Sequence, residues 1–159
     1  MRNILSDGRT IISTGLAFLV IGFAFGLWIG RFDLEILDTI SDPDQVRSVV
    51  AAMTPAQKSA HFWMTIVLDY PYPLAYGAFF AGIALRFYGR AGKWLVILAL
   101  IAASTDVIEN TIQLLILSGD DALIWLKVIM TQIKFAAFLP AALIALTGLG
   151  LGAYRRFFG

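Results

Sequence analysis

Four long apolar stretches constrain what this chain can fold into. They run from Thr10 to Gly30, from Phe62 to Leu85, from Trp94 to Ser118 and from Ala122 to Tyr154. Each meets the length of about 20 mostly apolar residues that a helix needs to cross a bilayer. The pattern predicts an all-α fold, an integral membrane four-helix bundle, with an outer loop at residues 31–61. Because the stretches use nearly the whole chain, we expect residues 1–159 to form a single transmembrane domain.

The composition excludes several other classes of protein. Of the 159 residues, 59% are hydrophobic and 14% are charged, and the mean hydropathy of +0.80 lies far outside the usage of soluble domains. No basic run suits nucleic acid, so no nucleic-acid partner is expected. The chain has no cysteine and a single histidine, His61, which excludes disulfides and a multi-histidine metal site within one chain. We therefore predict no metal site.

The first apolar stretch follows Arg2 and Arg9, as the apolar core of a signal peptide follows basic residues. It runs 21 residues without a charge and has no small-x-small cleavage site before Arg31. We interpret it as a retained helix.

The basic residues predict how the helices are oriented. Seven fall on one side of the predicted bundle: Arg2, Arg9, Arg86, Arg90, Lys93, Arg155 and Arg156. The outer loop has three, Arg31, Arg47 and Lys58, together with five acidic residues. Since cytoplasmic segments carry the excess of Lys and Arg, both termini should be cytoplasmic and the loop at 31–61 should lie outside.

Small residues form one face of the first predicted helix. Gly22, Gly26 and Gly30 follow one another at four-residue steps, and Gly15 precedes them. Such a face lets another helix approach closely. Contact with a neighbouring helix of the same bundle is the favoured interpretation, and a homo-oligomer or a larger membrane complex is the alternative.

The outer loop is expected to contain a short amphipathic helix. Asp42-Pro43-Asp44 is typical of an N-terminal cap with proline in the first turn. The apolar residues that follow recur at intervals of three and four: Val46, Val49, Val50 and Met53. Thr54-Pro55 then begins the run into the second apolar stretch. The short helix either covers the mouth of the bundle as a lid or is a connector in the headgroup layer.

Polar residues in the last three apolar stretches fall at helical spacing, which puts each set on one face. The second stretch carries Thr65, Asp69, Tyr72 and Tyr76, the third Asp106, Glu109, Asn110 and Gln113, and the fourth Lys127, Thr131 and Lys134. Three such faces in succession predict one shared polar interior.

The turn between the third and fourth stretches predicts which residues share a depth. A tight turn near Ser118-Gly119-Asp120-Asp121 requires these two helices to run antiparallel. Two pairs of residues then lie at the same level: Asp106 with Lys134, and Gln113 with Lys127.

The second loop gives a similar relation between the second and third stretches. A turn centred on Arg90 puts Asp69 level with Thr111 and beside Asn110. At about 1.5 Å per residue, all these polar groups lie roughly 10 to 20 Å below the outer surface.

The intramembrane charges must face inward and pair, because one charge at mid-helix costs about 2.5 to 3.5 kcal/mol. Asp106 with Lys134 is the predicted ion pair. Lys127 is shallow enough to extend its side chain to the outer interface. Asp69 and Glu109 then have no assigned cation, so the site is expected to hold a proton, a bound cation or a cationic ligand.

Two prolines interrupt the second stretch, within Asp69-Tyr70-Pro71-Tyr72-Pro73. They remove backbone donors and free the carbonyl groups of Val67 and Asp69. Such breaks at membrane depth persist where protein or a cavity satisfies the backbone. Tyr70, Tyr72 and Tyr76 can supply hydroxyls and aromatic walls for a cation or a flat apolar ligand.

Two resemblances follow from these residues. The run from Leu68 to Gly77, LDYPYPLAYG, followed by Asp106-Val107-Ile108-Glu109-Asn110, resembles a pattern in small, uncharacterised bacterial four-helix membrane proteins. The likeness covers the second and third predicted helices, about a third of the chain, and implies a multi-pass protein of the bacterial inner membrane. More distantly, the layout is similar to the EXPERA group, which includes sterol isomerases and a sterol-binding receptor and whose intramembrane acids hold cationic amphiphiles or stabilise a carbocation. That likeness concerns layout only, so no catalytic residue is carried over.

The favoured hypothesis is a ligand-binding site for a lipid-like or cationic amphiphile that enters from the outer leaflet, with membrane lipids as partners. Proton-transfer catalysis is a narrower version, in which one acid is protonated and another ionised. The sequence assigns no catalytic residue, cofactor or ligand identity. The candidate ligand-binding residues are Asp69, Tyr72, Tyr76, Asp106, Glu109, Asn110, Gln113 and Lys134.

Two other functions stay open. An accessory or structural subunit of a membrane complex is supported by the glycine face and the small size. Proton or ion translocation is less favoured, because the segment from Phe135 to Gly152 is almost wholly apolar and would interrupt a polar path. A stable lone protein with bound lipid would favour the binding hypothesis, and obligate co-purification with other subunits the accessory one.

Overall fold

The computed structural model describes residues 4–158 and is all-helical, with no strand among those residues. In chain order the elements are η1 (Ile4–Ser6), α1 (Gly8–Phe32), η2 (Leu37–Thr39), α2 (Pro43–Ala52), α3 (Pro55–Met64), the π-helical segment η3 (Thr65–Asp69), α4 (Pro71–Phe87), α5 (Gly89–Leu117), η4 (Asp121–Leu123) and α6 (Ile124–Phe158). Arg2, which contributed to the predicted orientation, lies outside the described residues.

Three segments in the described part of the chain are long and apolar enough to cross a membrane. They are Gly8–Phe32, Gly89–Leu117 and Asp121–Phe158, with mean hydropathies of 2.1, 1.7 and 1.9. These correspond to the first, third and fourth predicted helices. Their outer faces carry many exposed large hydrophobic residues, as surfaces in contact with lipid do.

The second predicted helix is divided. α3 begins at Pro55, earlier than predicted, because Thr54 and Gln57 form a capping box in which each side chain bonds to the other residue's backbone N–H. The chain then passes through η3 and restarts as α4 at Pro71. The break falls at the prolines, as the sequence predicted.

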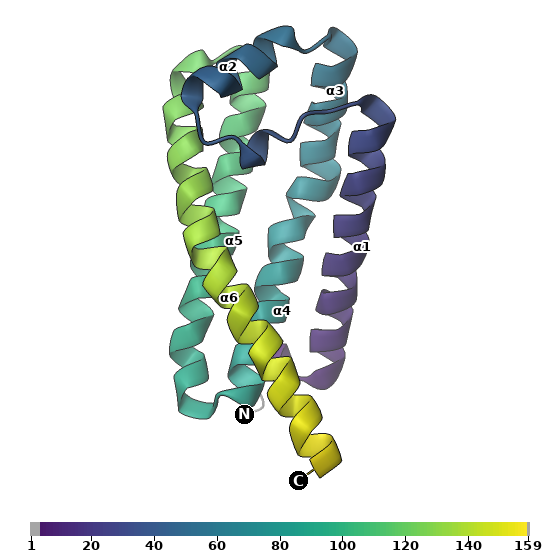
Figure 1. The fold of residues 1–159 in the computed structure, drawn as a ribbon, viewed down its shortest axis with the longest axis vertical. Coiled ribbons are helices and arrows are strands. Elements are labelled where there is room, and N and C mark those ends of the chain that lie inside the picture. Colours follow the sequence, from purple (N-terminus) through teal and green to yellow (C-terminus); the bar gives the residue numbers. More distant parts are fainter. Residues whose placement is uncertain (1–3, 159) are drawn as a thin grey trace.

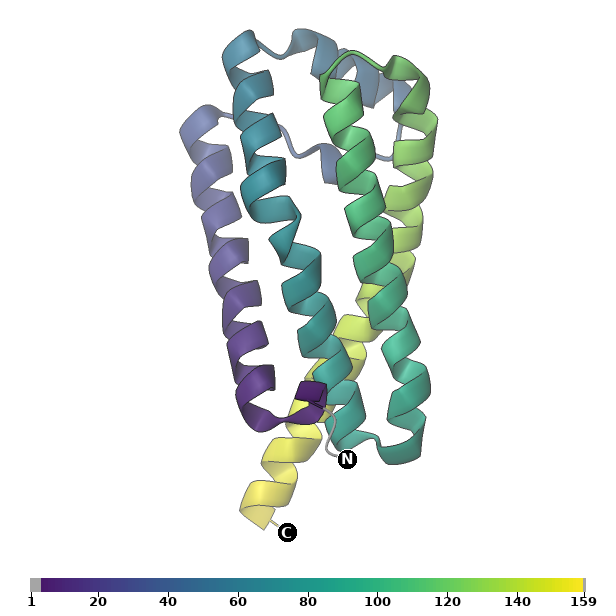
Figure 2. The same cartoon turned by 180° about the vertical axis from the view of Figure 1, so that it is seen from behind.

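Four helical columns run side by side, formed by α1, by α3 with α4, by α5 and by α6 (Figure 1). α4 packs against α1, α5 and α6, and α5 packs against α6 along its length. α6 crosses the others obliquely, and the same arrangement is seen from behind in Figure 2. The two ends of the described chain lie at the end of the molecule opposite α2.

The predicted short outer helix is present as α2. The Asp42 side chain accepts a hydrogen bond from the Asp44 backbone N–H at 2.9 Å, and Pro43 occupies the first turn. Val46 and Val50 are buried in an apolar cluster that includes residues of α5 and α6. α2 therefore covers the end of these helices rather than lying free of them (Figure 1).

The glycine face of α1 is divided between two environments. A Cβ at Gly15 would lie 2.8 Å from the Phe79 ring, and one at Gly22 would lie 3.6 Å from the Tyr72 hydroxyl, so this part packs against α4. Apart from the adjoining residues and the backbone of α1 itself, no heavy atom of residues 4–158 lies within 4 Å of the corresponding position at Gly26 or Gly30. Contact with a neighbouring helix of the same chain, the favoured interpretation, thus describes Gly15 and Gly22 but not Gly26 and Gly30.

Candidate functional site

Lys134 lies at the centre of a buried cluster of acidic side chains. Its Nζ is 2.6 Å from Glu109 Oε2, 2.8 Å from Asp38 Oδ2 and 3.5 Å from Asp106 Oδ1. The Lys134 side chain is only 6% exposed, so it cannot exchange these contacts for water without movement. The predicted pair with Asp106 is present, but it is the longest of the three. One ammonium is therefore shared by three carboxylates.

Two predictions about the neighbouring charges are wrong. The Lys127 side chain is 1% exposed and does not reach the outer interface; its Nζ lies 3.1 Å from Glu109 Oε1 and donates to the Leu37 carbonyl. Glu109, predicted to lack a cation, is fully buried between Lys127 and Lys134. The two lysines are seven residues apart, close to two helical turns, and so share the face of α6 that points inward. The turn between the third and fourth predicted helices had predicted the depth of the two lysines but not the direction in which the Lys127 side chain points.

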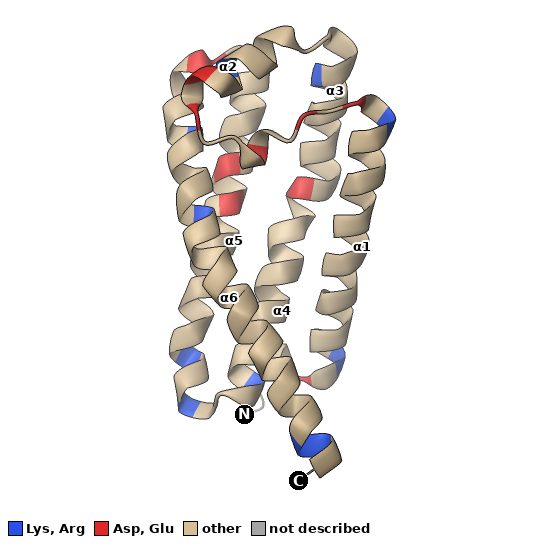
Figure 3. Cartoon of the chain, viewed as in Figure 1, with Lys and Arg blue, Asp and Glu red and all other residues tan. Residues whose placement is uncertain are grey.

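The segment between α1 and α2 covers this cluster and is tied to the helices below it. η2 carries Asp38 to Lys134 and the Leu37 carbonyl to Lys127. His61 Nε2, from α3, lies 3.3 Å from the Glu35 carbonyl oxygen. Figure 3 shows most of the acidic residues gathered in the half of the molecule near α2, where this segment crosses. We call residues 33–42 the lid.

The charge on Asp38 depends on the two lysines. Burial opposes ionisation and alone would raise its pKa, but the positive charges of Lys134 and Lys127, with the hydrogen bond from Lys134, outweigh burial and hold the pKa below the ordinary 3.8. Asp38 is therefore a carboxylate at neutral pH. The lid is fastened by a buried ion pair.

The break between η3 and α4 is satisfied by a side chain of α5. Asn110 Nδ2 donates to the Asp69 carbonyl at 3.0 Å, which is the carbonyl that Pro73 cannot engage four residues later. Asp69 and Asn110 are thus adjacent, as the second loop predicted. Gln113 Nε2 lies 3.4 Å from Thr65 Oγ1 and does not contact Lys127, although the two share a depth.

Asp69 differs from the other acids of the interior. It is 7% exposed, yet within residues 4–158 it forms no ion pair and its Oδ2 has no hydrogen-bond partner. His61 Nδ1 is likewise buried without a partner in that part of the chain. Because a carbonyl only accepts, His61 Nε2 carries the proton that bonds to Glu35, which leaves Nδ1 of the neutral ring as an acceptor.

Asp69 and His61, whose unpartnered Oδ2 and Nδ1 atoms we call the unused groups, line a cavity of about 290 Å³ under the lid. Its polar lining consists of Asp38, Thr39, His61, Asp69, Asp106 and Lys134. The apolar and aromatic lining comes from α1, α3, α4, α6 and the lid: Phe25, Ile29, Ile36, Met64, Tyr72, Tyr76, Phe135 and Phe138. The volume is near the lower end of the range of about 300 to 1,000 Å³ found for small-molecule sites.

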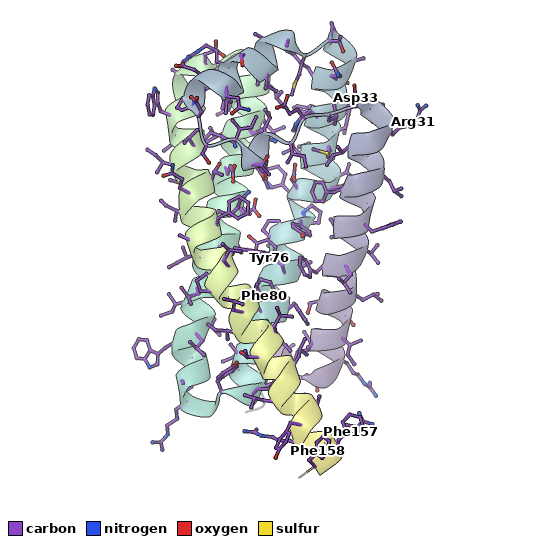
Figure 4. All side chains as sticks on the ribbon, in the orientation of Figure 1. Arg31, Asp33, Tyr76, Phe80, Phe157 and Phe158 are labelled. Carbon is purple, nitrogen blue, oxygen red and sulfur yellow. The ribbon has the colours of Figure 1, made fainter. Side chains whose placement is uncertain are left out.

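Tyr76 joins the two parts of this lining. Its hydroxyl donates to Asp106 Oδ2 at 2.9 Å, and its ring makes an edge contact with Phe138, with ring centroids 5.0 Å apart. Figure 4 shows Tyr76 in the interior, with Phe80 further from the lid. Of the predicted site residues, five line the cavity: Asp69, Tyr72, Tyr76, Asp106 and Lys134. Glu109, Asn110 and Gln113 lie outside the lining. Glu109 and Asn110 contact Lys134 and Asp69, which form part of it, whereas Gln113 contacts Thr65, which does not.

Carboxylate oxygens of Asp38, Asp106 and Glu109 lie within 4.8 Å of one another, close enough to hold one cation. The Lys134 ammonium is within 3.5 Å of all three residues. It therefore takes the position that a metal ion would need, and the donor set fits a lysine better than a metal.

Two residues of the site were not predicted. Asp38 was counted only as a charge of the outer loop, although Ile36, Leu37 and Ile40 around it are apolar enough to indicate a segment that turns inward. His61 was considered only as a metal ligand. Its place three residues from Met64 and four from Thr65, on the inward face of α3, is the signal that could have found it.

Comparison with protein-family models, with curated proteins and with solved structures finds no match to this chain.

Proposed function

We propose that this protein is an integral membrane four-helix bundle that binds an amphiphile in the cavity beside Asp69. The four proposed spans are α1, the column of α3 and α4, α5 and α6. The amphiphile's head group meets Asp69 and His61, and its tail runs along Phe25, Phe135 and neighbouring rings. One observation carries the proposal: a single cavity joins unused buried acceptors to an apolar, aromatic wall.

The unused groups define the chemistry of the head group. Asp69 Oδ2 and His61 Nδ1 are acceptors, so they require donors. The charges favour a cation: three buried acids, Asp69, Asp106 and Glu109, and the partly buried Asp38 face only two buried lysines. An alkyl ammonium satisfies both conditions, whereas a quaternary ammonium supplies the charge without donors.

The cavity is too small for a long tail, so the tail must leave it. Phe25 and Ile29 of α1 form one wall, and Phe135 and Phe138 of α6 another. Both helices expose apolar residues to the surrounding lipid. A ligand that enters between them keeps its tail in hydrocarbon while its head reaches Asp69, which is the least costly path for an amphiphile.

The proposed orientation has both termini in the cytoplasm of a bacterial inner membrane. Six basic residues of the described chain, Arg9, Arg86, Arg90, Lys93, Arg155 and Arg156, lie at the end opposite the lid (Figure 3). The positive-inside rule puts that end in the cytoplasm and the cavity in the outer half of the bilayer.

The contacts within the polar cluster make catalysis and ion translocation less favoured as functions of this protein. Of the three buried acids in the described part of the chain, Glu109 and Asp106 are engaged by Lys127, Lys134 and Tyr76, which leaves only Asp69 free for proton transfer. On the side away from the lid the interior is filled by an apolar cluster that includes Phe80, Ile83 and Ala141, without a polar path. An accessory subunit stays a second candidate because Gly26 and Gly30 have open space beside them; obligate co-purification with a partner chain would favour it.

The test uses three probes with the same twelve-carbon chain: dodecylammonium, dodecyltrimethylammonium and dodecanol. Binding to purified protein in nanodiscs is measured by calorimetry. Dodecylammonium should bind most tightly, and Asp69→Asn should abolish its advantage over the alcohol. Asp121→Asn, which removes an exposed acid from the third loop, is the control and should bind as the unmodified protein does. Equal binding of the three probes, or an Asp69→Asn variant that keeps the preference, would overturn the proposal.

A further inference from the structure

A second hollow lies at the end of the molecule opposite the lid, away from the site described above. It has a volume of about 590 Å³ and is lined by residues of α1, α4 and α6. Ile11 and Ile83, which are 7% and 0% exposed, form its base. Ile12, Leu149 and Phe157 are exposed on its sides, so apolar surface is continuous from the hollow to the outside of the helices.

Two arginines give this apolar groove a positive rim. Arg86 is on α4 and Arg156 is on α6, and both line it. Arg86 donates to the Ser6 carbonyl at 3.1 Å, which engages one of the five N–H donors of a guanidinium. Within residues 4–158 neither arginine has an acidic side chain within ion-pair distance. Their charge is therefore available to a ligand.

The residues around the groove are of the kinds found at the depth of membrane head groups. Lys and Arg gather at this end of the molecule in Figure 3, and Figure 4 shows Phe157 and Phe158 near the tip of α6. Aromatic and basic residues are typical of the boundary between hydrocarbon and water. A ligand here would have its polar part among head groups and its apolar part against Ile12 and Leu149.

We infer that this groove binds an anionic phospholipid, with its phosphate between Arg86 and Arg156 and an acyl chain along Ile12 and Leu149. Guanidinium groups bind phosphate oxygens with two parallel hydrogen bonds, and basic pockets between membrane helices select anionic head groups. A zwitterionic lipid has the same tail but a compensating positive charge, so it should bind more weakly. The site is independent of the outer cavity and requires only that the helices cross the membrane.

The test measures lipid adducts by native mass spectrometry after exchange into mixtures of phosphatidylglycerol and phosphatidylcholine. The unmodified protein should retain phosphatidylglycerol selectively. Arg86→Gln with Arg156→Gln should lower that selectivity about 30-fold, which corresponds to about 2 kcal/mol for two surface arginines. The matched control, Arg90→Gln with Lys93→Gln, removes two charges from the same end but not from the groove, and should keep the selectivity.

Two further variants and a competition experiment distinguish a lipid bound in the groove from general attraction to anionic lipid and from binding of phosphate alone. Arg156→Gln alone leaves the Arg86 bond to Ser6 intact and should lower the selectivity about fivefold. Ala153→Trp fills the groove without changing charge and should displace the lipid, which a purely electrostatic attraction would not predict. Inorganic phosphate at millimolar concentration should not compete. The inference is overturned if the control pair loses as much selectivity as the groove pair, if Ala153→Trp retains the lipid, or if phosphate displaces it.

Discussion

Lys134 Nζ lies closer to Glu109, at 2.6 Å from Oε2, than to Asp106, at 3.5 Å from Oδ1. Asp106 has a second partner in Tyr76, whereas Glu109 is held by two lysines. Glu109 and Lys134 therefore form the shortest of the ion pairs between α5 and α6 within residues 4–158, but Glu109 alone has a second lysine. Which acid compensates Lys134 decides how the site responds to mutation.

We predict that Lys134→Met destabilises the protein by about 3 to 5 kcal/mol, because it leaves buried carboxylates without their shared cation. Adding Asp106→Asn should recover more of this loss than adding Glu109→Gln, because Glu109 keeps Lys127 as its cation and its neutralisation would leave Lys127 buried without an acid. The measurement is the free energy of unfolding in mixed micelles for the single variants and both double variants. Equal recovery by the two acids would contradict the ranking that these contacts give, and additive losses would mean that the pairs do not interact.

The lid should respond to pH through Asp38. Because the folded-state pKa of Asp38 lies below 3.8, its ion pair stabilises the folded state above the unfolded pKa. That contribution is lost as pH falls below 3.8 and through the folded value. The hydrogen-exchange protection factors of residues 34–41 in the folded protein, which correct for the slower intrinsic exchange in acid, should therefore fall as pH drops below 3.8.

The matched variant for this measurement is Asp38→Asn, which keeps size but removes the charge. Its lid should be less protected from exchange at neutral pH and lack the acid-dependent loss of protection between the two pKa values. A variant whose lid shows the same pH profile as the unmodified protein would show that another group, rather than Asp38, fastens the lid.

Cysteines introduced into this cysteine-free chain test the orientation. Ser48 is exposed on α2 at the lid end, and Ala91 is exposed near the start of α5 at the opposite end. An impermeant thiol reagent applied to intact cells should label position 48 and not position 91. Gly89, in the same turn, is unsuitable because its φ of 55° strains any other residue. Labelling of position 91 alone would reverse the topology.

The sequence predicted those parts of the site that follow from helical spacing. Asp106 near Lys134, and Asn110 beside Asp69, come from residues at matched depths in helices joined by tight turns. The chain break at Pro71 and Pro73 and the short helix α2 come from local backbone chemistry, which proline and a capping aspartate determine within a few residues.

The parts that were missed depend on tertiary packing. Lys127 has the length to reach either lipid head groups or the interior, and only the position of Glu109 and the Leu37 carbonyl selects the interior. Asp38 lies in a segment without helical or strand periodicity, so no pattern indicates where its side chain points. Irregular segments take their conformation from the surface that they cover.

The last prediction concerns Asn110 and the proline break. Asn110 is 0% exposed, and its Nδ2 donates to the Asp69 carbonyl at 3.0 Å because Pro73 has no N–H for that carbonyl. Asn110→Ala should cost about 1 to 3 kcal/mol, the penalty of leaving a buried carbonyl without a partner. In a Pro73→Ala background the backbone N–H of residue 73 can donate a hydrogen bond to the Asp69 carbonyl. The cost of Asn110→Ala should then fall to well under half of its value in the unmodified protein.

The double-mutant cycle isolates this coupling. Pro73→Ala also gives the unfolded chain more conformational freedom. That effect is the same in the Pro73→Ala protein and in the Pro73→Ala, Asn110→Ala double variant, so it cancels when the cost of Asn110→Ala is calculated from these two proteins. Asn110 Oδ1 is buried without a hydrogen-bond partner within residues 4–158, so the side chain is retained for its donor rather than for its acceptor. Unfolding free energies of the four proteins give the coupling directly. If Asn110→Ala costs the same with and without Pro73, the amide does not compensate for the missing N–H, and another role must explain why an asparagine is buried beside Asp69.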